Sequence, residues 1–270
     1  FSWRTSFVYS RATNEVTKLL TNPTIQDMVG YNSQSATSQG GFAKEGYPLK
    51  SLFSVPFNGL NSSGLPTFTN QQGDATINGI RFDSQDVDFL KYSGTLIPTD
   101  KGSLSNTINY KGISLGVVLT YSYGNVVRLR GMRNIYNDYS TVPRELNNRW
   151  QYAGDENKTD IPVLYTTYMY QRLFNGWKEM NQAYLTYDYS DVRIAKGDNI
   201  RLKEISLGYT FDKNFLRESR IRQLSLKLQA TNVALLYADK KLNGDDPDYL
   251  ANGYAPIPPK RLIFTLRVGL

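Results

Sequence analysis

The stretch LIFTLRVGL, residues 262–270, decides the fold class because its side chains divide into two sets. Alternate residues of a β-strand point to opposite faces of a sheet. One face carries Leu262, Phe264, Leu266, Val268 and Leu270, and the other carries Ile263, Thr265, Arg267 and Gly269. A strand this apolar is an aggregation hazard at the edge of a soluble sheet, whereas in a closed transmembrane barrel it turns its apolar face to lipid. The stretch alone also allows the last strand of a soluble β-sandwich.

Other segments repeat this alternation. In Ile113–Arg130, apolar residues alternate with small or polar ones and end in Tyr121 and Tyr123, and a hairpin turn at Lys111–Gly112 joins this segment to Leu104–Tyr110. Tyrosines at a strand end are typical of the aromatic girdle of a membrane barrel. The remaining predicted strands are Phe1–Ser10, Phe42–Phe53 with an interruption at Pro48, Ile200–Phe211 and Ile221–Val233.

The connections between these strands alternate in length. Polar, glycine-rich segments follow Phe53, Arg130 and Val233, and the second of them has room for short helices or strands around 163–173 and 183–189. Short connections are expected at Lys111–Gly112 and at 212–220. Short turns on one side and long loops on the other favour an all-β, transmembrane antiparallel β-barrel with long extracellular loops.

The composition excludes several classes of protein. The 270 residues contain 20 Tyr but no Cys and no His, which removes disulfides, Cys/His zinc sites and Ser-His-Asp triads. The net charge of +7 comes from dispersed Lys and Arg without a basic run, so we expect no nucleic-acid partner. The first residues are already strand-like and carry no signal peptide, so we expect a fragment of a longer exported protein.

Five stretches together resemble the C-terminal part of the barrel of SusC-like TonB-dependent outer-membrane transporters. They follow the order of the family and cover most of the chain: EGYPLKSLFSVPFNGLNSSGLPTF (45–68), YSGTLIPTDKGSLSNTINYKGISLGVVLTYSYGNVVR (92–128), NRWQYAGDENKTDIP (148–162), NIRLKEISLGYTF (199–211), and LKLQATNVALL (226–236) with NGDDPDY (243–249). Two departures are Ala153, where the family usually has proline, and the final Leu270, where an aromatic residue is common.

This resemblance implies that residues 1–270 are the C-terminal portion of a barrel of roughly 22 strands, to which this chain would contribute about eight. The plug domain and the N-terminal strands would be supplied by the remainder of the same transporter. The resemblance further implies the outer membrane of a Gram-negative bacterium, import of oligosaccharides or peptides energised through TonB, and a SusD-like surface lipoprotein as a lid. Lipid and lipopolysaccharide would surround the wall.

Candidate binding residues lie in the long loops. Aromatic side chains that could stack on a sugar ring or a peptide side chain are Tyr136, Tyr139, Trp150, Tyr152 and Trp177, although packing among the loops is the commoner role of such residues. Weak candidates for calcium are the carboxylates of Asp155, Glu156 and Asp160, with a second acidic group at Asp245, Asp246 and Asp248; neither has EF-hand spacing. Arg128, Arg130, Arg133, Arg144 and Arg149 could attract an anion, but are expected to pair with local carboxylates or lipopolysaccharide phosphates.

Three alternatives were weighed against a transporter wall. A free-standing small barrel with a structural or adhesive role fits the strands but not the order of the five stretches. A secreted carbohydrate-binding sandwich would have polar outward faces on 113–123 and 262–270, and both are apolar. An enzyme is least favoured, because no catalytic constellation is recognisable, and no cofactor is expected.

Overall fold

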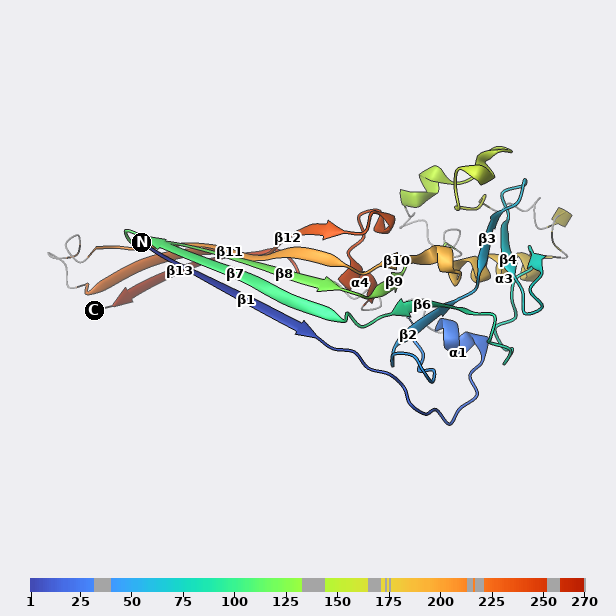
Figure 1. Ribbon diagram of the computed structural model, residues 1–270. Helices are drawn as coiled ribbons and strands as arrows, with labels where there is room; N and C mark the ends of the chain where they lie inside the picture. The colour runs from blue at the N-terminus through green and yellow to red at the C-terminus, as the bar shows by residue number, and fades with distance from the viewer. Residues whose placement is uncertain are drawn as a thin grey trace.

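The computed structural model describes residues 1–31, 40–132, 144–164, 171–172, 174, 176–212, 216, 221–251 and 258–269. A long antiparallel sheet forms one end of the molecule and a folded cluster of loops forms the other (Figure 1). Both chain termini lie at the end of the sheet that is remote from the loops. Within the described part of the chain, no helix has the length and apolarity needed to cross a membrane.

The long sheet has six strands in the order β1-β7-β8-β11-β12-β13, and every neighbouring pair is antiparallel. The strands are β1 (Ser2–Arg11), β7 (Asp100–Tyr110), β8 (Ile113–Tyr123), β11 (Asn199–Thr210), β12 (Gln223–Ala238) and β13 (Arg261–Gly269). The order of the strands in the sheet therefore follows their order in the chain, as it does in a barrel wall. The strands expected at 1–10 and 262–270 are confirmed as β1 and β13. Strands β7 and β8 meet at Lys111 and Gly112, whose φ angles of 46° and 85° suit a tight two-residue hairpin turn.

The two faces of this sheet differ in chemistry. Residues paired across antiparallel strands point to the same side, so the register defines rows that cross the sheet. One such row on what we call the apolar face is Trp3, Ile108, Leu115, Leu207, Leu228 and Phe264. A row on what we call the polar face is Ser2, Asn109, Ser114, Gly208, Lys227 and Thr265. The side chains of Leu207, Leu228 and Phe264 are 53%, 44% and 66% exposed, so the apolar face is open.

On β1 and β7, two polar residues of the apolar face, Thr5 and Asn106, form a hydrogen bond with each other. The Oδ1 atom of Asn106 accepts hydrogen bonds from Trp3 Nε1 at 3.1 Å and from Thr5 Oγ1 at 2.7 Å. Burying a polar group without a partner is costly in an apolar medium, and this arrangement reduces that cost.

Aromatic rings border the apolar face at both ends. Tyr110, Tyr209 and Phe211 lie toward the termini, and Tyr9, Tyr121, Tyr123 and Tyr237 lie toward the loops. The apolar rows between Ile113 and Tyr121 extend along about eight residue steps, or roughly 26 Å of strand. A strand tilt of about 40° reduces this to roughly 20 Å, close to the height of the apolar band of a membrane barrel.

The buried core lies in the loops. Of the described apolar residues that are buried, none belongs to the six long strands. The largest cluster includes Phe53, Val55, Phe68, Leu185 and Tyr187, which come from two different long loops. The elements of the loop cluster are α1 (Ile25–Val29), β2 (Ser51–Ser54), β3 (Phe57–Leu60), β4 (Pro66–Thr69), β5 (Ala75–Thr76), β6 (Lys91–Thr95), β9 (Val126–Arg128), η2 (Arg144–Asn148), η3 (Asp155–Asn157), α3 (Trp177–Asp188), η4 (Asp191–Arg193), β10 (Ile194–Lys196), η5 (Lys240–Leu242) and α4 (Pro247–Ala251).

The expected number of wall strands was too high. The described sheet has six strands instead of about eight, and one predicted strand that does not join it is Phe42–Phe53. Gly46, with a φ of 79°, and Pro48 break that segment, and only β2 remains, paired with β6 in a two-stranded sheet among the loops. The polar, glycine-rich segment predicted after Phe53 contains the short strands β3 to β6.

Adjacent substitutions on β12 should distinguish the two faces. Leu228→Arg places a charge on the apolar face and should destabilise the protein in a bilayer by roughly 2–4 kcal/mol, whereas Gln229→Arg on the polar face should cost much less. Urea unfolding of both variants in lipid vesicles measures the difference. Equal destabilisation by the two substitutions would show that the apolar face does not contact lipid.

Candidate functional site

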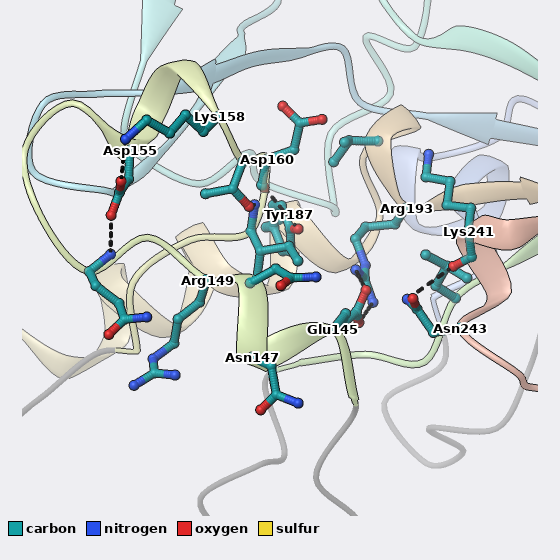
Figure 2. Close-up of a pocket in the computed structure, with 16 residues that line it drawn as sticks. Glu145, Asn147, Arg149, Asp155, Lys158, Asp160, Tyr187, Arg193, Lys241 and Asn243 are labelled. Atoms are coloured by element: carbon teal, nitrogen blue, oxygen red, sulfur yellow. Dashed lines mark hydrogen bonds and ion pairs between the residues drawn. The ribbon is translucent and has the colours of Figure 1, made fainter.

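A cavity of about 600 Å³ lies within the loop cluster, a size typical of small-ligand pockets. Figure 2 shows its side chains converging from separate loops. Glu145 and Asn147 come from η2, Asp155 from η3, and Arg193 from η4. Lys241 belongs to η5, so the last long loop also contributes to the wall of the cavity. The cavity exists only because two long loops fold against each other.

Arg193 and Glu145 form a buried ion pair at the cavity. Arg193 Nη1 donates to Glu145 Oε2 at 2.8 Å, and Arg193 Nη2 donates to Glu145 Oε1 at 2.6 Å. Nη2 also donates to the backbone oxygen of Arg130 at 2.6 Å, which joins η4 to the segment that follows β9. The guanidinium lies 5.4 Å from the centre of the Tyr187 ring. Such a bidentate ion pair fixes the position of η2 relative to η4.

Burial governs the ionisation of the groups around this pair. It raises the pKa of Tyr187, whose hydroxyl donates to the backbone oxygen of Asp160 at 3.0 Å. It opposes the charge of Arg193, but the neighbouring Tyr187 and Glu145 outweigh that effect, so the pKa of Arg193 is raised. Burial, together with the positive charge of Arg193, lowers the pKa of Lys241. Arg193 therefore stays charged, whereas Lys241 holds its proton less tightly than an exposed lysine.

The lining of the cavity suits a polar ligand. Amide side chains contribute both donors and acceptors: Asn147, Asn148, Gln151 and Asn243. Arg149, Lys158 and Lys241 bring positive charge, and Asp155 and Asp160 bring negative charge. Amides and charges of both signs can bind sugar hydroxyls, peptide groups or the charged termini of a short peptide. In this lining we recognise no nucleophile paired with a base.

The aromatic residues predicted as stacking groups have different environments. Trp150 is packed: its Nε1 donates to Glu156 Oε2 at 3.0 Å, and its ring lies against Gly64. Tyr152 is 75% exposed and does not line the cavity, although its neighbour Gln151 does. Tyr136 and Tyr139 lie outside the described residues, as does the side chain of Trp177.

Two of the three acidic candidates for calcium, Asp155 and Glu156, have other partners, and Asp160 lines the cavity. Asp155 accepts from the backbone N–H groups of Gln151 and Tyr152 and from Lys158 Nζ, so it caps a turn. Glu156 accepts from the backbone of Gly154 at 2.7 Å in addition to Trp150. Among the described residues, no group of three or more acidic side chains is arranged to hold a metal ion.

The second acidic group binds arginines. Arg201 Nη1 donates to Asp246 Oδ2 at 2.7 Å, and Nη2 also pairs with Asp246 and with Asp248. Arg130 Nε lies 3.2 Å from Asp245 Oδ2 and its guanidinium lies over Tyr249. These contacts tie the last long loop to β11 and to the segment after β9.

The remaining predicted arginines also serve packing among the loops. Arg128 is buried, donates to the backbone oxygen of Phe53 at 3.0 Å, and stacks over Tyr189. Arg149 donates to the backbone oxygen of Leu146, and Arg144 lies against Gly244. Arg133 is outside the described residues. The expectation of local carboxylate partners therefore holds for Arg130, whereas Arg128 and Arg149 bond to backbone oxygens.

Arg149, Asp155 and Asp160, which line the cavity, are among the candidates selected from the sequence, but several other lining residues are not. Arg193, Glu145, Tyr187 and Lys241 were not selected, because no motif joins positions so far apart in the chain. The available signal was the stretch 148–162, which was singled out by resemblance and which contributes part of the lining.

No family model matches the chain. A curated relative, TonB-dependent receptor P39 from Formosa agariphila, is 24% identical over 281 aligned residues, which cover 86% of this chain and 24% of that protein. The chain thus spans about a quarter of the length of the relative.

Solved structures of the RagAB peptide importer share the fold. The transporter structure matches with a TM-score of 0.61, and the "open-open" and "closed-closed" states match with 0.63 and 0.62, all at 18% identity. The matches cover 98–99% of this chain and 26% of the matched chain. The similarity to a TonB-dependent receptor and the shared fold agree with the resemblance that the five sequence stretches indicate, and the long sheet corresponds in fold to an open piece of a β-barrel wall.

The buried Arg193–Glu145 ion pair should contribute more to local stability than an exposed ion pair does. Glu145→Ala leaves the Arg193 guanidinium buried without its carboxylate, which should cost roughly 3–5 kcal/mol of local stability. Asp83→Ala removes the exposed partner of Arg81 and should have no measurable effect. Native-state hydrogen exchange of amides in α3 and η4 compares the two variants, and unchanged protection in Glu145→Ala would contradict the structural role of the pair.

Acid should release the last long loop. Burial raises the pKa of Asp246, but its hydrogen bonds with Arg201 outweigh burial, so the pKa is lowered from the ordinary value of 3.8. A depressed carboxyl pKa adds stability above that value, and this stability is lost as the pH falls through the folded-state pKa. The protection of the Leu250 amide, which donates to the backbone of Asp246, should therefore fall below pH 3.8 when its exchange rate is compared with the intrinsic rate at the same pH. Arg201→Gln should weaken this pH dependence, and an identical profile would refute the pairing.

Proposed function

We propose that this chain is part of an active transporter in the outer membrane of a Gram-negative bacterium, and that the transporter imports oligosaccharides or peptides. The observation that carries the proposal is the two-faced sheet with all of its long loops gathered at one end. An open apolar face bordered by aromatic rings is suited to lipid, and the polar face is suited to a hydrated, plugged lumen. Similarity to a TonB-dependent receptor and to a peptide importer supports the same function.

In this proposal, the chain forms one part of a larger barrel. Six strands account for about a quarter of a barrel of roughly 22 strands, so the plug and the other strands belong to the remainder of the transporter. Energy would come through TonB acting on the plug. A SusD-like lipoprotein would cover the loop cluster, which presents a folded surface at the end where such a lid would sit.

The substrate would meet the polar cavity and the exposed ring of Tyr152. The amides and mixed charges of the cavity can hydrogen-bond either a glycan or a peptide. The relatives are transporters and receptors rather than enzymes, and we extend this to the present chain: its loops would bind and pass a substrate without changing it.

The first test is the composition of the native complex. The protein extracted from outer membranes in mild detergent should have an intact mass far above the 30.7 kDa of this chain, with plug-bearing sequence and a lipoprotein present. A monodisperse barrel of 30.7 kDa without a partner would contradict the proposal and favour a small structural or adhesive barrel.

The contribution of Tyr152 can be measured separately. Tyr152→Ala should weaken substrate binding roughly three- to tenfold, because an exposed ring that stacks on the ligand is lost. Tyr110→Ala, at the opposite end of the sheet, is the control and should leave affinity unchanged. Isothermal titration with the transported glycan or peptide provides the readout, and equal affinities for both variants would remove Tyr152 from the binding surface.

A further inference from the structure

The regular register of the sheet is interrupted at one position on β11, between Leu202 and Glu204. Leu202 pairs with Leu119 of β8 and with Ala234 of β12, whereas Glu204 pairs with Val118 and with Thr231. Lys203 has no register partner on either side, so it is the extra residue of a β-bulge. On β12, Asn232 lies opposite this bulge and has a φ of 52°, a left-handed conformation that few residues other than glycine adopt. The bulge at Lys203 and the left-handed backbone at Asn232 change the directions in which the side chains of these residues point.

The bulge places Lys203 on the apolar face. Lys203 is exposed and falls in phase with Ile205, Leu207 and Tyr209, which are all exposed on that face. Its Nζ donates to Asn232 Oδ1 at 2.8 Å. Asn232 in turn is in phase with Leu228 and Ala230 on the same face. A charged side chain therefore emerges among apolar ones.

A second lysine lies at the same height. Asn232 Nδ2 donates to the backbone oxygen of Pro259 at 3.2 Å, which brings the start of β13 beside it. Lys260 follows, is exposed, and immediately precedes β13, two residues before Leu262 of the apolar face. Lys203 and Lys260 thus flank Asn232 on neighbouring strands, about 10 Å apart at ordinary strand spacing.

The ammonium groups of this pair lie within reach of a membrane interface. Lys203 lies between Leu202, which pairs with Leu119, and Glu204, which pairs with Val118, so its backbone is inside the apolar band, about two to three residue steps from the tyrosine border at Tyr121. A lysine side chain can extend its ammonium group by that distance while its methylene stem stays in an apolar layer. The cost of a charge on the lipid face falls to about 0–1 kcal/mol near the interface, so the position is tolerable.

No acidic side chain neutralises these lysines within the sheet. Strands β12 and β13 contain no Asp or Glu, and Glu204 points to the polar face in the row of Ser105 and Val118. Neither lysine forms an ion pair with another described residue. Two adjacent cations with an amide between them are suited to an anion with several oxygen atoms, such as a phosphate.

We propose that Lys203 and Lys260, together with Asn232, bind the phosphate of a phosphorylated glycolipid in the outer leaflet of the membrane. This inference rests on the proposed function, because that function places the loop end of the sheet at the outer surface. The site would anchor a lipid at one fixed position on the barrel wall.

The test uses the whole transporter, purified from outer membranes, and lipid A as the probe. Native mass spectrometry measures lipid A retained by the wild type, by Lys203→Gln with Lys260→Gln, and by Lys227→Gln, a control on the polar face of β12. We expect binding to weaken roughly fivefold for each lysine removed from the site, with no change in the control. Lipid A stripped of phosphate should bind to the wild type as weakly as intact lipid A binds to the double variant.

The outcomes separate this inference from the proposed function. Equal retention by the wild type and the double variant, or equal binding of lipid A with and without phosphate, overturns the lipid site and leaves the transporter proposal intact. Equal or stronger retention of phosphatidylglycerol than of lipid A overturns the assignment to a glycolipid. Absence of the protein from outer membranes overturns both proposals. Heat-modifiable migration on gels checks that each variant is folded.

Discussion

The pairing of backbone N–H and C=O groups between six antiparallel strands is the constraint on which the rest of the structure depends. In an apolar medium these groups have no water to bind, so a spanning sheet must satisfy them within itself. The pairing fixes the register, and the register sorts side chains into rows such as Trp3 to Phe264 on one face and Ser2 to Thr265 on the other. An open apolar face follows directly from this sorting.

Because the sheet turns its apolar side chains outward, the core of the molecule forms elsewhere. Buried residues gather in the loop cluster, where hydrophobic packing and buried arginines replace the support that a soluble sheet obtains from a second layer. Arg193 joins Glu145 to the segment after β9, and Arg201 holds the last loop against β11. The polar cavity is a consequence of this interlocking, since its walls come from loops that are remote in sequence.

The sequence predicts the wall far better than the loops. Period-two alternation in 113–123 and 262–270 is a local property, and so is the tight turn at Lys111–Gly112, so both could be found from neighbouring residues. The misplaced strand at Phe42–Phe53 had its warning in Gly46 and Pro48. Helix α1 also had a local signal, the capping box of Thr24 and Asp27, which was overlooked. The Arg193–Glu145 pair had none, because two positions 48 residues apart meet only after the loops have folded.

The central claim is that neighbouring residues of one strand contact lipid and a hydrated lumen in alternation. These 270 residues contain no cysteine, so Leu228→Cys and Gln229→Cys each introduce one labelling site here, and any cysteine in the remainder of the transporter is replaced before spin labelling and reconstitution in vesicles. Electron paramagnetic resonance then compares relaxation by oxygen, which concentrates in lipid, with relaxation by a water-soluble nickel chelate. The account predicts oxygen-dominated relaxation at 228 and greater chelate access at 229. Equal exposure of both labels to the chelate would show that the sheet is not part of a membrane wall.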